Sequence, residues 1–205
     1  MKIIWILVVY VGAVVAARAQ IVIPDTITLI NGQTVIGEVL EVNQDYIVYN
    51  YFKKKKTIKK GVSPLIVYSI AYASGQREVI YEKNEEEDLY LTKEEMLYFI
   101  KGQQDAREYY RTRGIFIGGF AIGGVAGYVL YDEIYVATVP FLYSVGAGLT
   151  NIEVRQNPST TEDIRRTAAY QEGYLKVARS RKVFAALAGS VLGTAAGIFA
   201  GNVTR

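Results

Sequence analysis

Residues 183–201 read VFAALAGSVLGTAAGIFAG, an uncharged run in which small residues recur at every fourth position. Residues four apart share one face of an α-helix, and small side chains there let a second backbone approach closely, as happens between helices in lipid. The run predicts a membrane helix whose small-residue face, a glycine zipper, packs tightly against another helix of the same chain or of another copy. The positions on this face are Ala185, Gly189, Gly193, Gly197 and Gly201.

Two more uncharged runs, 114–131 and 134–150, precede this one and are separated by Asp132 and Glu133. Both are near the lower limit of the ~17–25 residues that a helix needs to cross a bilayer. We expect residues 114–150 to form a membrane helical hairpin. The first run repeats the four-residue spacing, which predicts a second packing face made of Gly119, Gly123 and Gly127.

The N-terminus has the pattern of an export signal. A basic tip, Met1-Lys2, precedes an apolar run over 3–17, and Ala17-Arg18-Ala19 places small residues at the two positions that a signal peptidase recognises. We expect a signal peptide over 1–19, cleaved before Gln20; an uncleaved anchor helix is the alternative. The chain has no Cys, so a lipid anchor on an acylated cysteine is excluded and the polypeptide itself must attach to the membrane.

Residues 25–82 have the pattern of short strands joined by turns. Asn31-Gly32 accepts positive φ in a tight hairpin between two segments rich in β-branched residues. Five short strands in this range predict a small β-barrel of the SH3-like or Sm-like kind, and an α+β fold for the chain. The expected strands cover 26–30, 35–42, 46–52, 65–70 and 78–81.

Residues 83–113 are expected to hold a charged linker and a connecting helix. The acidic run 85–88 lacks the spaced ligands and glycine turn of a calcium loop, which favours a linker. Thr92 and Glu95 have the spacing of a capping box, so a helix should begin at Lys93 and continue to about Arg111. A second capping box at Ser159–Glu162 predicts an amphipathic helix that runs into the glycine-rich membrane helix, over 159–204.

A lysine cluster follows the third expected strand. Lysines commonly protect an edge strand or a solvated hairpin tip, and we favour that role over contact with an anionic surface. The net charge of +3 is too small to indicate a nucleic-acid partner. The cluster comprises Lys53, Lys54, Lys55, Lys56, Lys59 and Lys60.

Charges around the uncharged runs bear on location. Basic residues precede the first and third runs, and acidic residues follow the first. The positive-inside rule would place the basic flanks in the cytoplasm, whereas export places them in the periplasm. An outer-membrane destination removes the conflict, so we favour the outer membrane over the inner one, with the β-domain in the periplasm.

Four short motifs stand out near these runs and at the start of the expected β-domain: Asp25 to Gly32, Gly102 to Arg107, Gly173-Tyr174 and Ala178 to Lys182. Together they resemble a group of uncharacterised secreted or membrane proteins from Bacteroidetes-type bacteria. The resemblance implies an envelope location and a β-domain followed by glycine-rich membrane helices, and it carries over no catalytic or ligand residue.

The composition argues against catalysis. The chain contains no Cys and no His, which removes thiol nucleophiles, imidazole bases and the usual zinc ligands, and it has no phosphate-binding loop or nucleophile elbow. We expect no enzyme activity, no cofactor and no metal. The sequence favours a membrane-anchored accessory or structural envelope protein whose β-domain binds another envelope component. The alternative is an oligomeric pore or transport-complex subunit built from glycine-faced helices.

Overall fold

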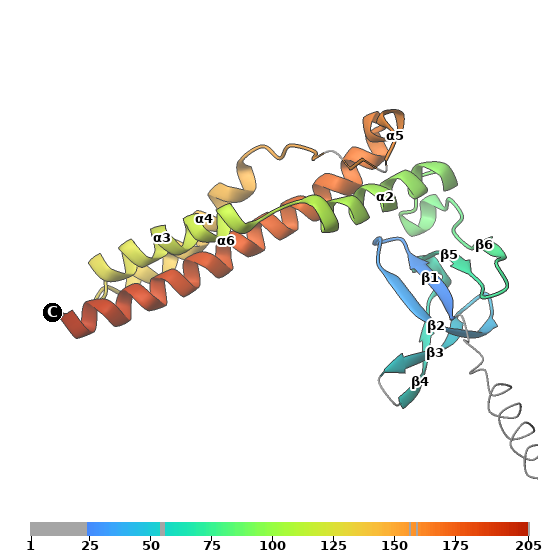
Figure 1. Cartoon of the computed structure of the whole chain (residues 1–205), viewed down its shortest axis with the longest axis horizontal. Helices are drawn as coiled ribbons and strands as arrows, with labels where there is room; N and C mark the ends of the chain where they lie inside the picture. The colour runs from blue at the N-terminus through green and yellow to red at the C-terminus, as the bar shows by residue number, and fades with distance from the viewer. Residues whose placement is uncertain (1–23, 54–55, 156, 159, 205) are drawn as a thin grey trace, which may run out of the picture.

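The structure is a computed structural model that describes residues 24–53, 56–155, 157–158 and 160–204. The expected signal peptide, Lys54 and Lys55 lie outside these residues. The fold is α+β, as the sequence predicts: an antiparallel sheet is followed by helices that extend away from it (Figure 1). The C-terminus lies at the end of the helices farthest from the sheet.

The described residues between Asp25 and Val79 form a six-stranded antiparallel sheet in the order β4-β3-β2-β1-β5-β6. Within these residues the edge strands β4 and β6 do not pair with each other, so the sheet is open and the expected SH3-like or Sm-like barrel is not confirmed. The strands are β1 Asp25–Leu29, β2 Thr34–Val42, β3 Ile47–Lys53, β4 Lys56–Val62, β5 Val67–Ala71 and β6 Arg77–Val79.

The β1–β2 turn is the predicted Asn31-Gly32 turn. Gly32 has φ +76°, and the Asn31 side-chain oxygen accepts a hydrogen bond of 2.9 Å from the Gln33 backbone N–H. Asp25, at the other end of β1, accepts bonds from the backbone N–H groups of Val39 and Ala73 at 2.7 and 2.8 Å. The core of the sheet consists of Ile27, Ile47, Tyr49, Val67 and Ile70.

Helix α2, Lys93–Tyr109, begins with the predicted capping box. The Thr92 hydroxyl accepts from the Glu95 backbone N–H at 3.2 Å, and the Glu95 carboxylate accepts from the Thr92 N–H at 2.8 Å. The acidic linker contains the short 3₁₀ turn η2, Glu85–Glu87. The first half of α2 packs on the sheet through Met96, Phe99 and Ile100, next to the buried rings of Tyr68 and Tyr81.

Four helical segments lie between α2 and the long last helix, and the first three of them cover the expected hairpin. The expected hairpin corresponds to α3, Arg113–Val129, then η3, Ile134–Thr138, and α4, Val139–Leu149. The last helix, α6, Ala168–Thr204, is the spine of the molecule, because α2, α3 and α4 all pack mainly along it.

The helix expected over 159–204 is interrupted. Helix α5, Glu162–Arg166, ends at Thr167, and α6 begins after it. Ser159, the first residue of the second predicted capping box, lies outside the described residues. Thr161 is the N-cap of α5 and makes no side-chain capping bond, while the Thr160 hydroxyl bonds to Asp105 instead.

Among the described helices, α6 alone is long and apolar enough to cross a membrane by itself. Helices α2 and α3 would give a second span if they are counted together, although the pair is bent by 58° at its break. The apolar segment Ile134–Leu149 is shorter.

Candidate functional site

The predicted glycine faces of α3 and α6 contact each other within one chain. A Cβ at Gly119 would lie 2.8 Å from the Ala186 carbonyl oxygen, and one at Gly123 would lie 2.9 Å from the Thr194 backbone nitrogen. Contacts this close recur at Gly127, Gly189, Gly193 and Gly197. Gly201 faces the Tyr131 ring, and Ala185 is buried. The two helices run parallel, since contact positions advance together along both.

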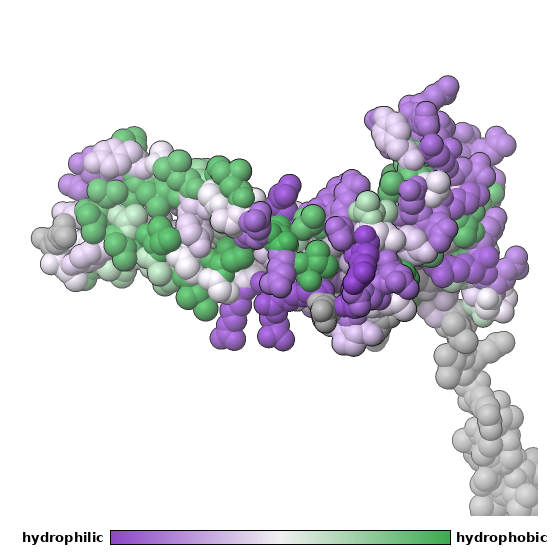
Figure 2. Space-filling view, turned by 90° about the horizontal axis from the view of Figure 1, so that it is seen from above, coloured by the Kyte–Doolittle hydropathy of each residue, from purple (hydrophilic) through white to green (hydrophobic). Residues whose placement is uncertain are grey.

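Helices α3 and α6, together with α4, expose their large apolar side chains. Small residues such as Gly123, Ser190 and Gly193 are buried between them, while Leu142 is 70% exposed and Phe199 is 73% exposed. Figure 2 shows the apolar surface gathered at the C-terminal end of the molecule, with the hydrophilic surface over the sheet and α2. This inverted pattern, small inside and large apolar outside, defines the unit that we call the apolar body, residues 113–149 and 183–204.

Two neighbouring basic side chains of α6 hold helix ends at the border of the apolar body. Arg181 donates to the carbonyl oxygens of Ala106, at 3.1 Å, and Arg107, near the end of α2. Buried Lys182 donates to the Thr150 carbonyl at 3.0 Å and to its hydroxyl, just after α4. Cations are favourable at helix C-termini, where carbonyl groups lack partners. The Ala178–Lys182 motif therefore fixes the ends of two helices.

The β1–β2 turn rests on α2. The Arg107 guanidinium donates to the Asn31 carbonyl at 2.6 Å, and the Gln104 amide donates to the Gly32 carbonyl at 3.4 Å. A Cβ at Gly32 would lie 2.8 Å from both Arg107 Nη1 and Gln103 Oε1. Since Arg107 also offers its carbonyl to Arg181, one residue connects the sheet to α6.

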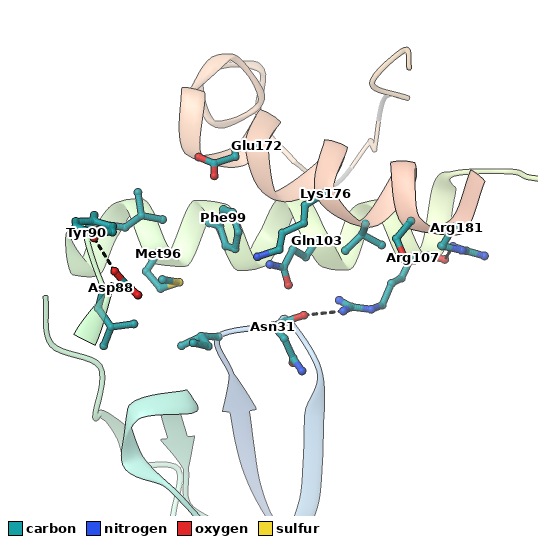
Figure 3. A pocket seen from close by; sticks show the side chains of 15 residues that line it. Asn31, Asp88, Tyr90, Met96, Phe99, Gln103, Arg107, Glu172, Lys176 and Arg181 are labelled. Carbon is teal, nitrogen blue, oxygen red and sulfur yellow. Dashed lines mark hydrogen bonds between the residues drawn. The ribbon is translucent and has the colours of Figure 1, made fainter. Parts of the chain in front are cut away.

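A pocket of about 780 Å³ opens beside this contact, between the β1–β2 turn, residues 88–91, α2 and α6 (Figure 3). Met96 and Phe99 give it an apolar wall, and Lys176 Nζ lies 5.5 Å from the centre of the Phe99 ring. The Tyr90 hydroxyl donates to Asp88 at 2.7 Å at the rim, and this bond raises the Tyr90 pKa. The pocket combines apolar contact with both signs of charge, as ligand-binding pockets commonly do.

A buried polar cluster surrounds Asp105 on the side of α2 that faces α6, Asn157 and Thr160. Its carboxylate accepts from Asn157 Nδ2 at 2.7 Å, from the Thr160 hydroxyl at 2.7 Å and from the Tyr170 hydroxyl at 2.9 Å. Lys101 Nζ lies 3.5 Å away. With Asp105 only 2% exposed, these bonds satisfy a charge that would otherwise be costly to bury. The cluster ties the connection between α4 and α5 to the helices.

The described lysines of the predicted lysine cluster lie on the sheet, away from the apolar body (Figure 1). Lys53 and Lys56 pair across the β3–β4 turn, and Lys59 and Lys60 lie on the edge strand β4. Lys60 Nζ lies 5.1 Å from the centre of the Tyr51 ring. The structure does not bring these lysines together with the glycine faces.

Sequence reasoning did not identify the roles of Asp105, Arg107 and Arg181, although all three lie in the motifs on which the resemblance depends. A buried Asp looks like any surface Asp in a helical sequence, because its partners are 52 to 65 residues away. One indication of these roles is present in the sequence: the motifs combine glycine with polar residues inside segments expected to be helical, where glycine is not needed for a turn.

In the part of the chain that the structure describes, no group of His, Cys, Asp or Glu side chains could hold a metal ion. No protein-family model matches the chain, and no curated protein or solved structure matches it either.

Proposed function

We propose that this protein is a non-enzymatic, membrane-anchored envelope protein whose apolar body lies in lipid and holds the sheet and the pocket at the membrane surface. The observation that carries this proposal is the inverted packing of the apolar body. Its helices bury glycine against backbone and expose Val125, Phe141, Leu142, Phe184 and Phe199.

The free energy of exposing large apolar side chains is unfavourable in water but not in lipid. Transferring one large apolar side chain out of water is worth about 1.5–3 kcal/mol, so exposing many of them to water would be strongly unfavourable. In lipid no such cost exists, and close van der Waals packing through small residues is what holds helices together. The apolar window of α6 is only 33% buried, whereas the core helix of a water-soluble protein would be mostly buried.

The proposal is tested on the full-length protein with alkaline carbonate extraction and flotation of membranes. We expect the native protein to stay with the membranes. The double variant Val125→Asp/Leu142→Asp should shift to the supernatant, because a carboxylate at the centre of a span costs about 2.5–3.5 kcal/mol.

The matched control is Ile36→Asp/Leu65→Asp, which changes two exposed apolar residues of the sheet domain. It should float like the native protein. Recovery of the native protein in the supernatant without detergent would overturn the proposal.

We also propose that the chain is exported, that the sheet lies in the periplasm and that the outer membrane is the destination. The basic residues beside the apolar body lie on the same side of it as the sheet, which conflicts with the inner-membrane charge rule if the sheet is exported. Density separation of the two membranes tests this proposal. A protein that is found with the inner membrane and whose sheet resists protease in spheroplasts would contradict it.

The pocket is where we propose that another envelope component binds. Tyr90, at the pocket rim, is 61% exposed, and the pocket lies on the polar side of the apolar body. A photo-crosslinking residue at Tyr90 should capture a partner in whole cells. The same residue at Tyr46, which is also exposed but lies just before β3 and does not line the pocket, should not capture it. Equal yields from both positions would argue against the pocket as the binding site.

An oligomeric pore is less well supported. The glycine faces of α3 and α6 contact each other in one chain, so neither face is free to pair with a second copy. Reconstituted protein should therefore give no ion conductance.

A further inference from the structure

A group of basic side chains lies where the apolar body begins. Two of its members, Arg181 and Lys182, point inward and hold helix ends. Three others, Arg111, Arg113 and Arg179, are exposed, and their side chains form no ion pair or hydrogen bond with any described residue. We call these three exposed arginines the basic rim.

Contacts between α3 and α6 place two of the three arginines, Arg113 and Arg179, along the axis of α6. Phe116 of α3 packs against Gly189, so Arg113, three residues earlier, lies near the level of Ala186. Arg179 precedes that level by two helical turns, so at 1.5 Å per residue these two arginines lie about 10 Å apart along the axis. Arg111 is two residues before Arg113 in the sequence. The basic rim therefore forms a narrow band and not a dispersed charge.

Exposed apolar side chains begin directly beside this band. Ile117, four residues after Arg113, is 56% exposed, and Phe184, five residues after Arg179, is 73% exposed. The opposite end of the apolar body carries Asp132 and Glu133 and, among its described residues, no lysine or arginine. The two ends of the body thus differ in the sign of their charge.

We propose that the basic rim binds the phosphate groups of anionic phospholipids; this inference rests on the proposed membrane anchor. A guanidinium group presents two parallel N–H donors that match two phosphate oxygens. Placement beside the apolar surface selects a lipid headgroup, because the acyl chains of a bound lipid would lie along Ile117 and Phe184 while its phosphate meets the rim. Nearby acids, Glu108 and Glu153, are fewer than the basic groups.

The test uses the full-length protein in phosphatidylcholine vesicles that contain phosphatidylglycerol. Spin-labelled lipids report how strongly each headgroup associates with the protein. We expect a preference for phosphatidylglycerol of about fivefold for each arginine engaged at low salt, falling as ionic strength rises. The triple variant Arg111→Gln/Arg113→Gln/Arg179→Gln should lose the preference.

The matched control is Lys56→Gln/Lys59→Gln/Lys60→Gln, which removes the same charge from β4, outside the apolar body. It should keep the preference, and circular dichroism should show native helix content in both variants. Equal loss in both would mean that net charge alone is responsible, and the proposal would fail. If the native protein inserts but shows no headgroup preference, the rim proposal falls while the anchor stands; if it does not insert at all, the anchor falls.

Discussion

A Cβ at Gly193 would lie 2.8 Å from the Cα of Phe120 and closer still to the Phe120 carbonyl oxygen. The neighbour here is backbone, which cannot rotate away as a flexible side chain can. This pair lies in the middle of the α3–α6 interface, with Gly189 and Gly197 in similar contacts one turn to either side. Close packing between the two helices therefore depends on the absence of a side chain at this position.

Gly193→Ala should destabilise the apolar body. One added methyl group forces the helices apart, and overpacking of this kind costs about 1–3 kcal/mol. The measurement is the unfolding midpoint in mixed detergent micelles, followed by circular dichroism. Because the contact is within one chain, oligomeric state in detergent should not change.

Gly146→Ala is the control for that substitution. Gly146 lies in α4, in the same apolar body, and a Cβ there would meet nothing within 4 Å. Alanine should be neutral there or stabilise by up to about 1 kcal/mol, because it favours helix. Equal effects of the two substitutions would show that helix propensity and not packing explains the glycine pattern.

Gly32→Ala should destabilise the protein by more than the backbone strain of alanine at positive φ, because it also disturbs the contact between the sheet and α2. Gly32 and Gly75 both have positive φ, +76° and +88°, where alanine is strained by about 1–2 kcal/mol. Only at Gly32 would the new Cβ meet other groups, the Gln103 and Arg107 side chains. Thermal unfolding should show a larger drop in midpoint for Gly32→Ala than for Gly75→Ala. Equal drops would mean that the turn does not depend on α2.

Asp105→Asn should loosen the connection between α4 and α5. An amide presents an N–H₂ group where the carboxylate accepts three hydrogen bonds, and losing bonds to a buried charge costs about 2–3 kcal/mol. Arg155, in this connection, is exposed and should become more sensitive to trypsin. Asp163→Asn, in the short helix α5 and exposed, is the control and should leave the cleavage rate unchanged.

Local patterns account for what the sequence predicts well. The capping box of α2 needs only Thr92 and Glu95, and the β1–β2 turn needs only the conformational freedom of Gly32. The glycine spacing likewise predicts which face of α6 packs, because four-residue periodicity is a property of one helix. These predictions use residues within a few positions of one another.

The rest depends on contacts between distant residues. The sequence predicts only a lysine-rich hairpin tip or edge strand where β4 lies, because lysine has low β-propensity. Pairing with β3 stabilises the strand, and that contact is not visible in the local sequence. Closure of a barrel depends on how the edge strands meet, which no short motif specifies. The break between α5 and α6 lies at Thr167, and residues on either side of it, Thr160 and Tyr170, bond to Asp105. A local helix-start pattern does not encode contacts between residues 55 to 65 positions apart.

Acid should weaken the start of α2 through Glu95. The hydrogen bond that its carboxylate accepts from the Thr92 backbone is the main reason that the Glu95 pKa lies below its ordinary value of 4.5, and the Thr92 side chain adds to this effect. A carboxyl group with a lowered pKa in the folded state contributes stability that is fully present above pH 4.5. That contribution is lost as the pH falls through the lower, folded value.

Glu95→Gln isolates this effect, since glutamine keeps an acceptor oxygen but does not titrate. Above pH 4.5 the native protein should have a higher unfolding midpoint than Glu95→Gln. The gap between the two midpoints should shrink as the pH falls below 4.5. Glu86→Gln is the control, because the Glu86 side chain forms no hydrogen bond or ion pair with a described residue. Its difference from the native protein should stay near zero throughout. A Glu95→Gln difference that does not vary with pH would mean that capping geometry, and not the charge on Glu95, stabilises the start of α2.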